Sequence, residues 1–241
     1  MGKSKTEHAP FTGFPKDFFG FFRDLAAHND REWFAANKDR YRISVQEPML
    51  SFIAAMDLPL GRVADCFLAD TRTVGGSMFR IYRDTRFAHD KRPFKENAAC
   101  HFRHVAGKDA HAPGFYVHLE PGDVFFGGGI WNPPAPALAG VREAIVADPE
   151  RWKKVTRSAA FRRRFGEIAG DRLKRPPKGF DPEHPLVEDL KHTSFFAVQR
   201  VKPEAIHAKT FVAEVARCFT AMAPFMEFLT DALDLPFHLD D

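Results

Sequence analysis

The spacing of apolar residues changes twice along this 241-residue chain, from a helical period to a period of two and back. Early apolar residues recur three to four positions apart, as in Phe14, Phe18 and Leu25, which predicts an amphipathic helix. From about residue 67 to 127 the period is two, which is typical of strands. The pattern therefore predicts an α+β fold: one antiparallel sheet flanked by N-terminal and C-terminal helices.

The strands are expected at four places in the middle of the chain and at one place near residue 195. Turn residues at Glu120–Asp123 predict a hairpin between the last two central strands. We interpret the run 127–129, three glycines, as a tight turn after a strand, although its amides could also approach an anion. The expected strands are 79–82, 100–103, 115–119, 123–126 and 193–200.

Helices are expected before and after this region. The first covers residues 14–28, and a longer one begins at Asp30 and runs through Val45, with a kink or a new turn near Pro48. A C-terminal helix extends from Phe211 to Leu233, and we expect Pro224 to break it.

Composition indicates one globular unit. A hydrophobic fraction of 44% with 26 phenylalanines can build a sizeable core, so we expect a single domain over residues 11–241 after a flexible leader, residues 1–10. Three separated cysteines predict packed, reduced thiols. The chain has no apolar run long enough for a membrane span and no secretory signal, so we expect a cytoplasmic protein without a membrane partner.

Positive charge is concentrated in two segments. The segment from Arg80 to Lys95 holds six basic residues against Asp84 and Asp90, and residues 151–178 are more basic still. Such clustering favours an anionic partner.

The first basic segment carries a long motif, R-x-x-R-D-x-R-F followed by D-K and an aromatic residue. The chain thereby resembles the bacterial and fungal family catalogued as domain of unknown function 2461, and the likeness extends to residues 29–34 and 127–131. The resemblance implies no particular activity. Phe94 departs from it, because most members are expected to have tyrosine there. The matching residues are Arg80, Arg83, Asp84, Arg86, Phe87, Asp90, Lys91 and Phe94.

The planar fork of arginine suits bidentate contact with carboxylate or phosphate. One hypothesis is an anion-binding pocket in which Asp84 and Asp90 orient the basic residues, which requires a bend because alternate strand residues face opposite sides. The other is an internal network in which the arginines pair with carboxylates such as Glu32 or Glu120 and hold the fold together. The proposed anion-binding residues are Arg80, Arg83, Arg86, Lys91 and Lys95.

Tyr116, His118 and Glu120 alternate along one face of an expected strand. His118 and Glu120 are the candidates for acid-base catalysis, although a hydrogen-bonded surface pair is the interpretation we favour. No metal site is predicted, since a third ligand would have to come from His101 or His104 on another strand. No nucleophile-elbow, zinc-protease or phosphate-loop motif occurs, and nothing in the sequence identifies a cofactor or an oligomeric state.

The second basic segment, centred on Arg162–Arg164 and continuing to Arg175, could follow a nucleic-acid backbone, but charge runs are usually solvated and no known module accompanies it. Two classes of function therefore stay open. One is an enzyme acting on an anionic small molecule; the other is a non-catalytic module that binds an anionic ligand, nucleic acid or a protein.

Overall fold

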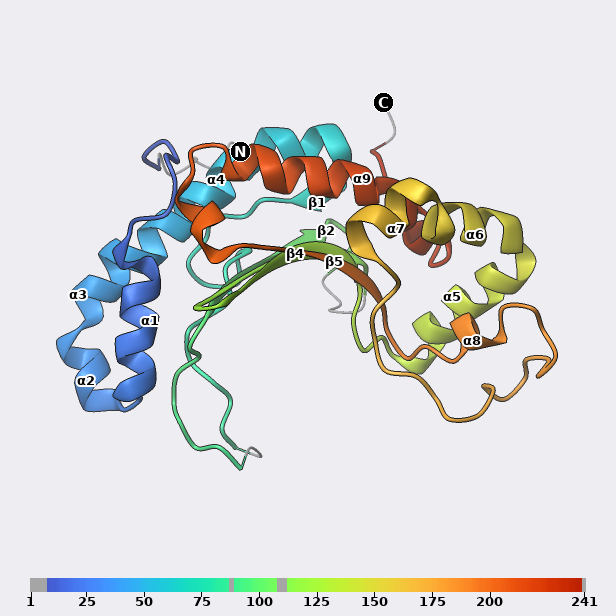
Figure 1. Cartoon of the computed structure of the whole chain (residues 1–241), viewed down its shortest axis with the longest axis horizontal. Coiled ribbons are helices and arrows are strands. Elements are labelled where there is room, and N and C mark those ends of the chain that lie inside the picture. Colours follow the sequence, from blue (N-terminus) through green and yellow to red (C-terminus); the bar gives the residue numbers. More distant parts are fainter. Residues whose placement is uncertain (1–7, 87–88, 108–111, 240–241) are drawn as a thin grey trace.

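A curved sheet forms the centre of the protein, with helices over its convex face and at both ends (Figure 1). The structure, a computed structural model, describes residues 8–86, 89–107 and 112–239. Residues 1–7 of the expected leader, residues 1–10, lie outside this range.

The sheet has five antiparallel strands that lie side by side in chain order, which confirms the predicted α+β fold. Strands β3 and β4 form the predicted hairpin. Its turn has Pro121 followed by Gly122 at φ 89°, a positive φ that glycine adopts without strain. The strands are β1 Phe67–Leu68, β2 Ala98–His104, β3 Gly114–Glu120, β4 Asp123–Ile130 and β5 Phe195–Val201.

The prediction of a tight turn at Gly127–Gly129 is wrong, because these glycines lie inside β4 and pair with β5. A Cβ atom at Gly127 would overlap the carbonyl oxygen of Ala197, and one at Gly128 would lie 2.8 Å from the sulfur of Met226. The glycines therefore allow β5 and helix α9 to approach β4 closely.

The helices before the sheet are shorter than the sequence suggests. Asp30 caps α2 by accepting a hydrogen bond from the amide of Trp33 at 2.8 Å, but the expected long helix is divided into short segments. A π-helical turn, Arg42–Gln46, leads directly into α4, which begins at Glu47 and has Pro48 in its first turn. These elements are α1 Asp17–Ala27, α2 Arg31–Ala36, α3 Lys38–Tyr41 and α4 Glu47–Val63.

Helix α9, Phe211–Asp231, is the longest element after the sheet, and the expected break at Pro224 does not occur. Residues on both sides of Pro224, including Met222 and Phe225, are fully buried, and this packing holds the helix together across the proline. The other elements are α5 Ala135–Ala147, α6 Pro149–Arg157, α7 Ala159–Phe165, α8 Val187–Leu190 and a 3-10 turn, Pro203–His207.

The two faces of the sheet differ. Alternate β3 residues such as Phe115 and Val117 are fully buried beneath the helices, and α4 and α9 cover this convex side in Figure 1. Tyr116 and His118 lie on the opposite, concave side. The three cysteines are buried, as expected of packed thiols. Among the described residues, no helix combines the length and apolarity needed to cross a membrane.

Candidate functional site

The hallmark segment, which we define as residues 80–95, bends away from the sheet instead of forming the strand predicted over 79–82. Two isolated β-bridges occur here in the described chain, Met78 to Cys100 just before the segment and Tyr82 to Phe94 within it. The bend allows Ile81 and Phe94 to reach the hydrophobic core, where they are 5% and 2% exposed. In Figure 1 the segment runs beside α1 and α2.

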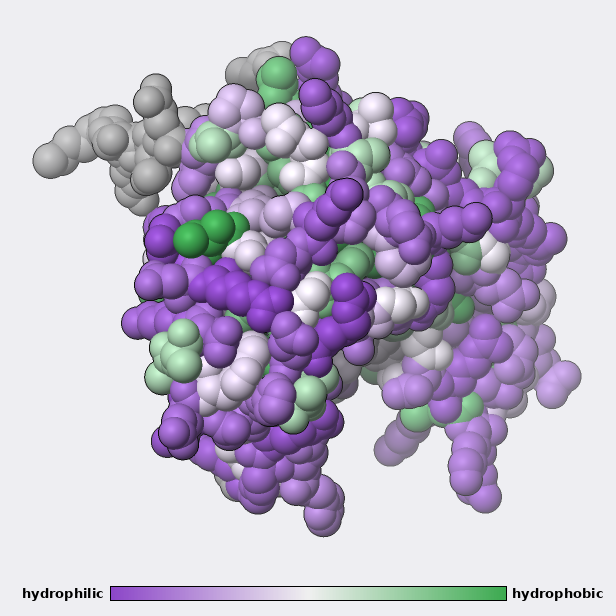
Figure 2. Space-filling model, turned by 60° about the vertical axis from the view of Figure 1, so that its left-hand side comes forward, coloured by the Kyte–Doolittle hydropathy of each residue, from purple (hydrophilic) through white to green (hydrophobic). Residues whose placement is uncertain are grey.

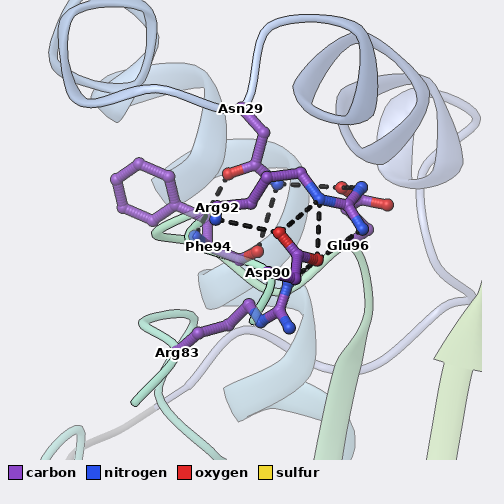
Figure 3. A network of polar contacts seen from close by, with 6 residues as sticks. All are labelled: Asn29, Arg83, Asp90, Arg92, Phe94 and Glu96. Carbon is purple, nitrogen blue, oxygen red and sulfur yellow. Dashed lines mark hydrogen bonds and ion pairs between the residues drawn. The ribbon is translucent and has the colours of Figure 1, made fainter. Parts of the chain in front are cut away.

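Asn29, between α1 and α2, anchors this segment. Its side chain accepts a hydrogen bond from the amide of Phe94 and donates to the carbonyl of the same residue, both at 3.1 Å, and it also donates to Glu96 at 2.8 Å. The Phe94 ring stacks on Phe34 of α2 with 4.2 Å between ring centroids. These contacts hold the hallmark segment against α2 (Figure 3).

Asp90 lies at the centre of the polar network in Figure 3. It accepts a hydrogen bond from Nη1 of Arg83 at 2.5 Å and is also bound by Arg92. Arg92 reaches on to Glu96 at 2.5 Å. These hydrogen bonds, those from Arg92 above all, hold the pKa of the Asp90 carboxyl far below its usual value. Two arginines and two carboxylates thus balance their charges within the network.

Asp84 and Arg86 form a separate pair on the surface. Nη2 of Arg86 donates to Asp84 at 2.7 Å, and hydrogen bonds from Arg86 lower the pKa of Asp84 to about 2. Both side chains are mostly exposed. The hallmark residue Phe87 lies outside the described residues.

The other proposed anion-binding residues do not gather around Arg83. Lys91 is exposed and donates to the carbonyl of Thr85 at 3.0 Å. Lys95 lies over the ring of Phe79, 5.2 Å from its centroid, where burial and the nearby charge of Arg80 lower its pKa. Arg80 is exposed. Arg80 and Lys95 are thus close enough to affect each other, whereas Arg86 is paired with Asp84.

Arg83 instead borders a pocket between the hallmark segment and the helices α2 and α3. This hallmark pocket has a volume of about 360 Å³. Its positive residues are Arg83, Arg31 and Lys38, and among the residues that the structure describes no carboxylate lines it. The lining residues are Arg31, Phe34, Ala35, Lys38, Tyr82, Arg83, Thr85, Pro93 and Phe94.

Sequence reasoning missed the contribution of α2 and α3 to this pocket. Arg31, Phe34, Ala35 and Lys38 are spaced at i, i+3, i+4 and i+7, which places them on one face of a helical segment. That spacing was a usable signal. This face has basic residues at its ends and apolar residues in its middle, but no local pattern shows that it lies against the hallmark segment.

The surface on this side of the molecule is largely hydrophilic, and its apolar areas are small and separate (Figure 2). A broad apolar patch would have indicated a protein-protein interface. No broad apolar patch of that kind is visible on this face in Figure 2.

The candidate catalytic residues lie elsewhere, on the concave face of the sheet. His118 is 2.9 Å from Glu120, and the Tyr116 hydroxyl is 3.2 Å from the other ring nitrogen of His118. Burial raises the pKa of Tyr116 to about 12. None of these three residues lines the hallmark pocket.

The two histidines considered as further metal ligands point to opposite sides. His101 pairs with Tyr116 across the sheet, whereas His104 is buried on the helix side and contacts the carbonyl of Pro236 at 2.7 Å. Over the described ranges no group of three or more His, Cys, Asp or Glu side chains is arranged to hold a metal ion.

The second basic segment is spread over several elements. Arg164 donates to the carbonyl of Arg217 at 2.8 Å, and Arg157 pairs with Asp189 at 2.6 Å. Arg163 is exposed. Several of these charges are thus engaged within the fold.

The fold and the site define an α+β protein in which a bent, arginine-rich segment and a short helix enclose a basic pocket with aromatic walls. The family model described as a conserved hypothetical protein (DUF2461) matches residues 17–228. The chain belongs to this family, which confirms the resemblance seen in the sequence. Neither a curated protein nor a solved structure matches the chain.

Proposed function

We propose that this protein binds a small organic anion, a phosphate or carboxylate attached to a planar apolar group, in the hallmark pocket. The observation that carries the proposal is the composition of the pocket wall, in which Arg31, Lys38 and Arg83 occur without a carboxylate. The volume of about 360 Å³ falls within the range of small-molecule sites, roughly 300–1,000 Å³.

Arg83 contributes to anion binding in a different way from Arg31 and Lys38. The charge of Arg83 is balanced inside the network with Asp90, so Arg83 supplies directed N–H donors: the bond to Asp90 uses Nη1 and leaves Nε and Nη2. Arg31 and Lys38 form no ion pair with a carboxylate among the residues the structure describes, so they supply the net positive charge.

The aromatic side chains of the pocket favour a ligand whose anionic group is attached to a planar apolar group. Phe34, Tyr82 and Phe94 line the pocket, and the Phe34 and Phe94 rings are stacked on each other. Tyr82 is 57% exposed, so its ring offers a surface on which a planar group can pack.

The binding role is favoured over an enzymatic one. An enzyme using the predicted residues requires His118 or Glu120 near the bound anion, and neither lines the pocket. A nucleic acid would instead need a continuous basic track, whereas this pocket is small and local.

Titration with phenyl phosphate, inorganic phosphate and benzyl alcohol tests the proposal by calorimetry at about 0.1 M ionic strength. We expect saturable binding of phenyl phosphate at least tenfold tighter than that of either other compound. Equal affinity for phenyl phosphate and inorganic phosphate, with both lost in Arg31→Gln/Lys38→Gln, would refute the role of the aromatic walls, and no binding of phenyl phosphate would refute the proposal.

A further inference from the structure

A second pocket lies at the opposite end of the molecule, among α6, α7, α8 and the start of β5. Its volume is about 220 Å³, and it shares no residue with the hallmark pocket. Part of the second basic segment forms its wall. The lining residues are Thr156, Arg157, Arg162, Gly166, Glu167, Ile168, Arg172, Asp189 and His192.

His192 is the most deeply buried residue of this wall, with only 1% of its surface exposed. Its Nε2 lies 3.0 Å from Nε of Arg172. Because a guanidinium only donates, Nε2 must accept, and the proton of the neutral ring must be on Nδ1. Burial and the charge of Arg172 lower the pKa of His192, consistent with a neutral ring. Within the described part of the chain Nδ1 has no partner, so a buried N–H donor lacks an acceptor.

Arg142, on α5, lies next to His192 and also has a buried N–H donor without an acceptor in the described chain. It is 8% exposed, and its Nη2 donates to the backbone carbonyl of His192 at 3.0 Å. Its Nε finds no acceptor among the residues described, and burial lowers its pKa. A buried guanidinium without a counter-charge is costly, so an anion close by would stabilise this region.

The exposed rim adds positive charge. Arg157 is neutralised by Asp189 at 2.6 Å, which leaves Arg162 and Arg172 against Glu167. Glu167 is on the exposed part of the rim, whereas His192 is deep in the wall. The net charge that a ligand meets is therefore positive.

We propose that this pocket binds a tetrahedral oxyanion, phosphate or sulfate, between Arg162, Arg172 and His192. The pocket is smaller than the roughly 300 Å³ typical of organic ligands, which favours the free ion over a phosphorylated metabolite. The site is independent of the hallmark pocket and of the function proposed for it.

Isothermal titration with inorganic phosphate tests this site in the Arg31→Gln/Lys38→Gln background, where the hallmark pocket is disabled. We expect saturable binding that Arg162→Gln and Arg172→Gln each weaken about tenfold. Arg163→Gln removes the same charge from an exposed neighbour outside the pocket and leaves the affinity unchanged. Arg162 is also exposed, so its variant stays informative if Arg172→Gln does not fold.

The ring nitrogens of His192 provide a second readout, by ¹H–¹⁵N correlation spectroscopy. Bound phosphate should shift the Nδ1 signal in proportion to occupancy. If the chemical shift of Nδ1 does not change on addition of phosphate, a buried water satisfies this N–H and the proposal is overturned. So would equal losses of affinity in Arg162→Gln and Arg163→Gln. Glycerol phosphate binding as tightly as phosphate would overturn the preference for the free ion.

Discussion

Arg83 and Asp90 are joined by a 2.5 Å hydrogen bond between Nη1 and Oδ2, across the loop of the hallmark segment. The sequence posed ligand binding and internal pairing as alternatives for these residues. The structure shows the internal pair, in which Asp90 accepts a hydrogen bond from one N–H of Arg83, and it also places Arg83 at the border of the hallmark pocket. Internal pairing thus orients the side chain that we propose for the ligand.

Replacing Asp90 shows whether its carboxylate orients Arg83 for the ligand or competes with the ligand for Arg83. Arg92 also pairs with Asp90, so the carboxylate repels a nearby anion only weakly. Asp90→Asn therefore acts mainly by leaving Arg83 less well oriented, and we expect it to weaken phenyl phosphate binding about three- to tenfold. The matched control is Asp84→Asn, which removes the same charge beside Arg86 but outside the pocket. Calorimetric affinities of the two variants are compared; tighter binding by Asp90→Asn would show that the carboxylate competes with the ligand.

Asn29 is expected to matter for stability more than a typical half-buried polar residue. Asn29→Ala leaves both backbone groups of Phe94 and one oxygen of Glu96 without these partners, so we expect a loss of about 1–3 kcal/mol. Urea denaturation measures it. Asn37→Ala removes a side-chain hydrogen bond to Trp33 within the same helical region and should cost less. Equal costs would mean that the link to the hallmark segment contributes nothing beyond one local bond.

Alanine substitutions at two glycines, Gly127 in β4 and Gly61 in α4, are expected to change stability in opposite directions. Gly127→Ala places a methyl group on the backbone of Ala197, and we expect it to destabilise the fold by about 1–3 kcal/mol. At Gly61, in α4, a Cβ atom meets nothing within 4 Å, so Gly61→Ala should stabilise by roughly 0.5–1 kcal/mol. Thermal and urea unfolding of both variants check the prediction. A neutral Gly127→Ala would show that β5 can move away from β4.

The periodicity of the sequence predicted the sheet and most of its strands because alternate burial on one covered face leaves a clear pattern, as in Phe115 and Val117. It failed at Gly127–Gly129, since a glycine needed for close packing resembles a glycine needed for a turn. It also failed at Pro224, where burial of the surrounding helix outweighs the missing backbone donor. Both errors arise where tertiary contacts override a local preference.

Local patterns in the sequence identified single residues of the candidate site but not the long-range contacts that form the pocket. The motif identified Arg83 and Asp90, and alternation placed His118 beside Glu120. The pocket itself depends on Arg31, which lies more than fifty positions before Arg83. No local pattern reports a contact over that separation, so α2 could be recognised as amphipathic but not assigned to the site.

Stability should depend on pH through His101, on the concave face beside Phe79 and Tyr116. Burial lowers its pKa to about 4, whereas an unfolded histidine titrates near pH 6.5. Between these values the unfolded chain binds the extra proton, so stability is lost as pH falls from about 6.5 to 4, by about 3 kcal/mol.

His101→Gln should flatten this part of the profile, and His89→Gln, at an exposed site, should preserve it. Urea unfolding at intervals between pH 4 and 7 measures both. An unchanged slope in His101→Gln would assign the acid sensitivity to other groups.

The contribution of positive charge to the hallmark pocket is tested by the affinity for phenyl phosphate of Arg31→Gln and Lys38→Gln, measured by calorimetry beside Arg86→Gln. Arg31 and Lys38 line the pocket, whereas Arg86 is exposed outside it and paired with Asp84. Each pocket variant should bind about tenfold more weakly than the unmodified protein, a difference of about 1.4 kcal/mol, with Arg86→Gln unchanged. Equal affinity in all three variants and the unmodified protein would contradict the account.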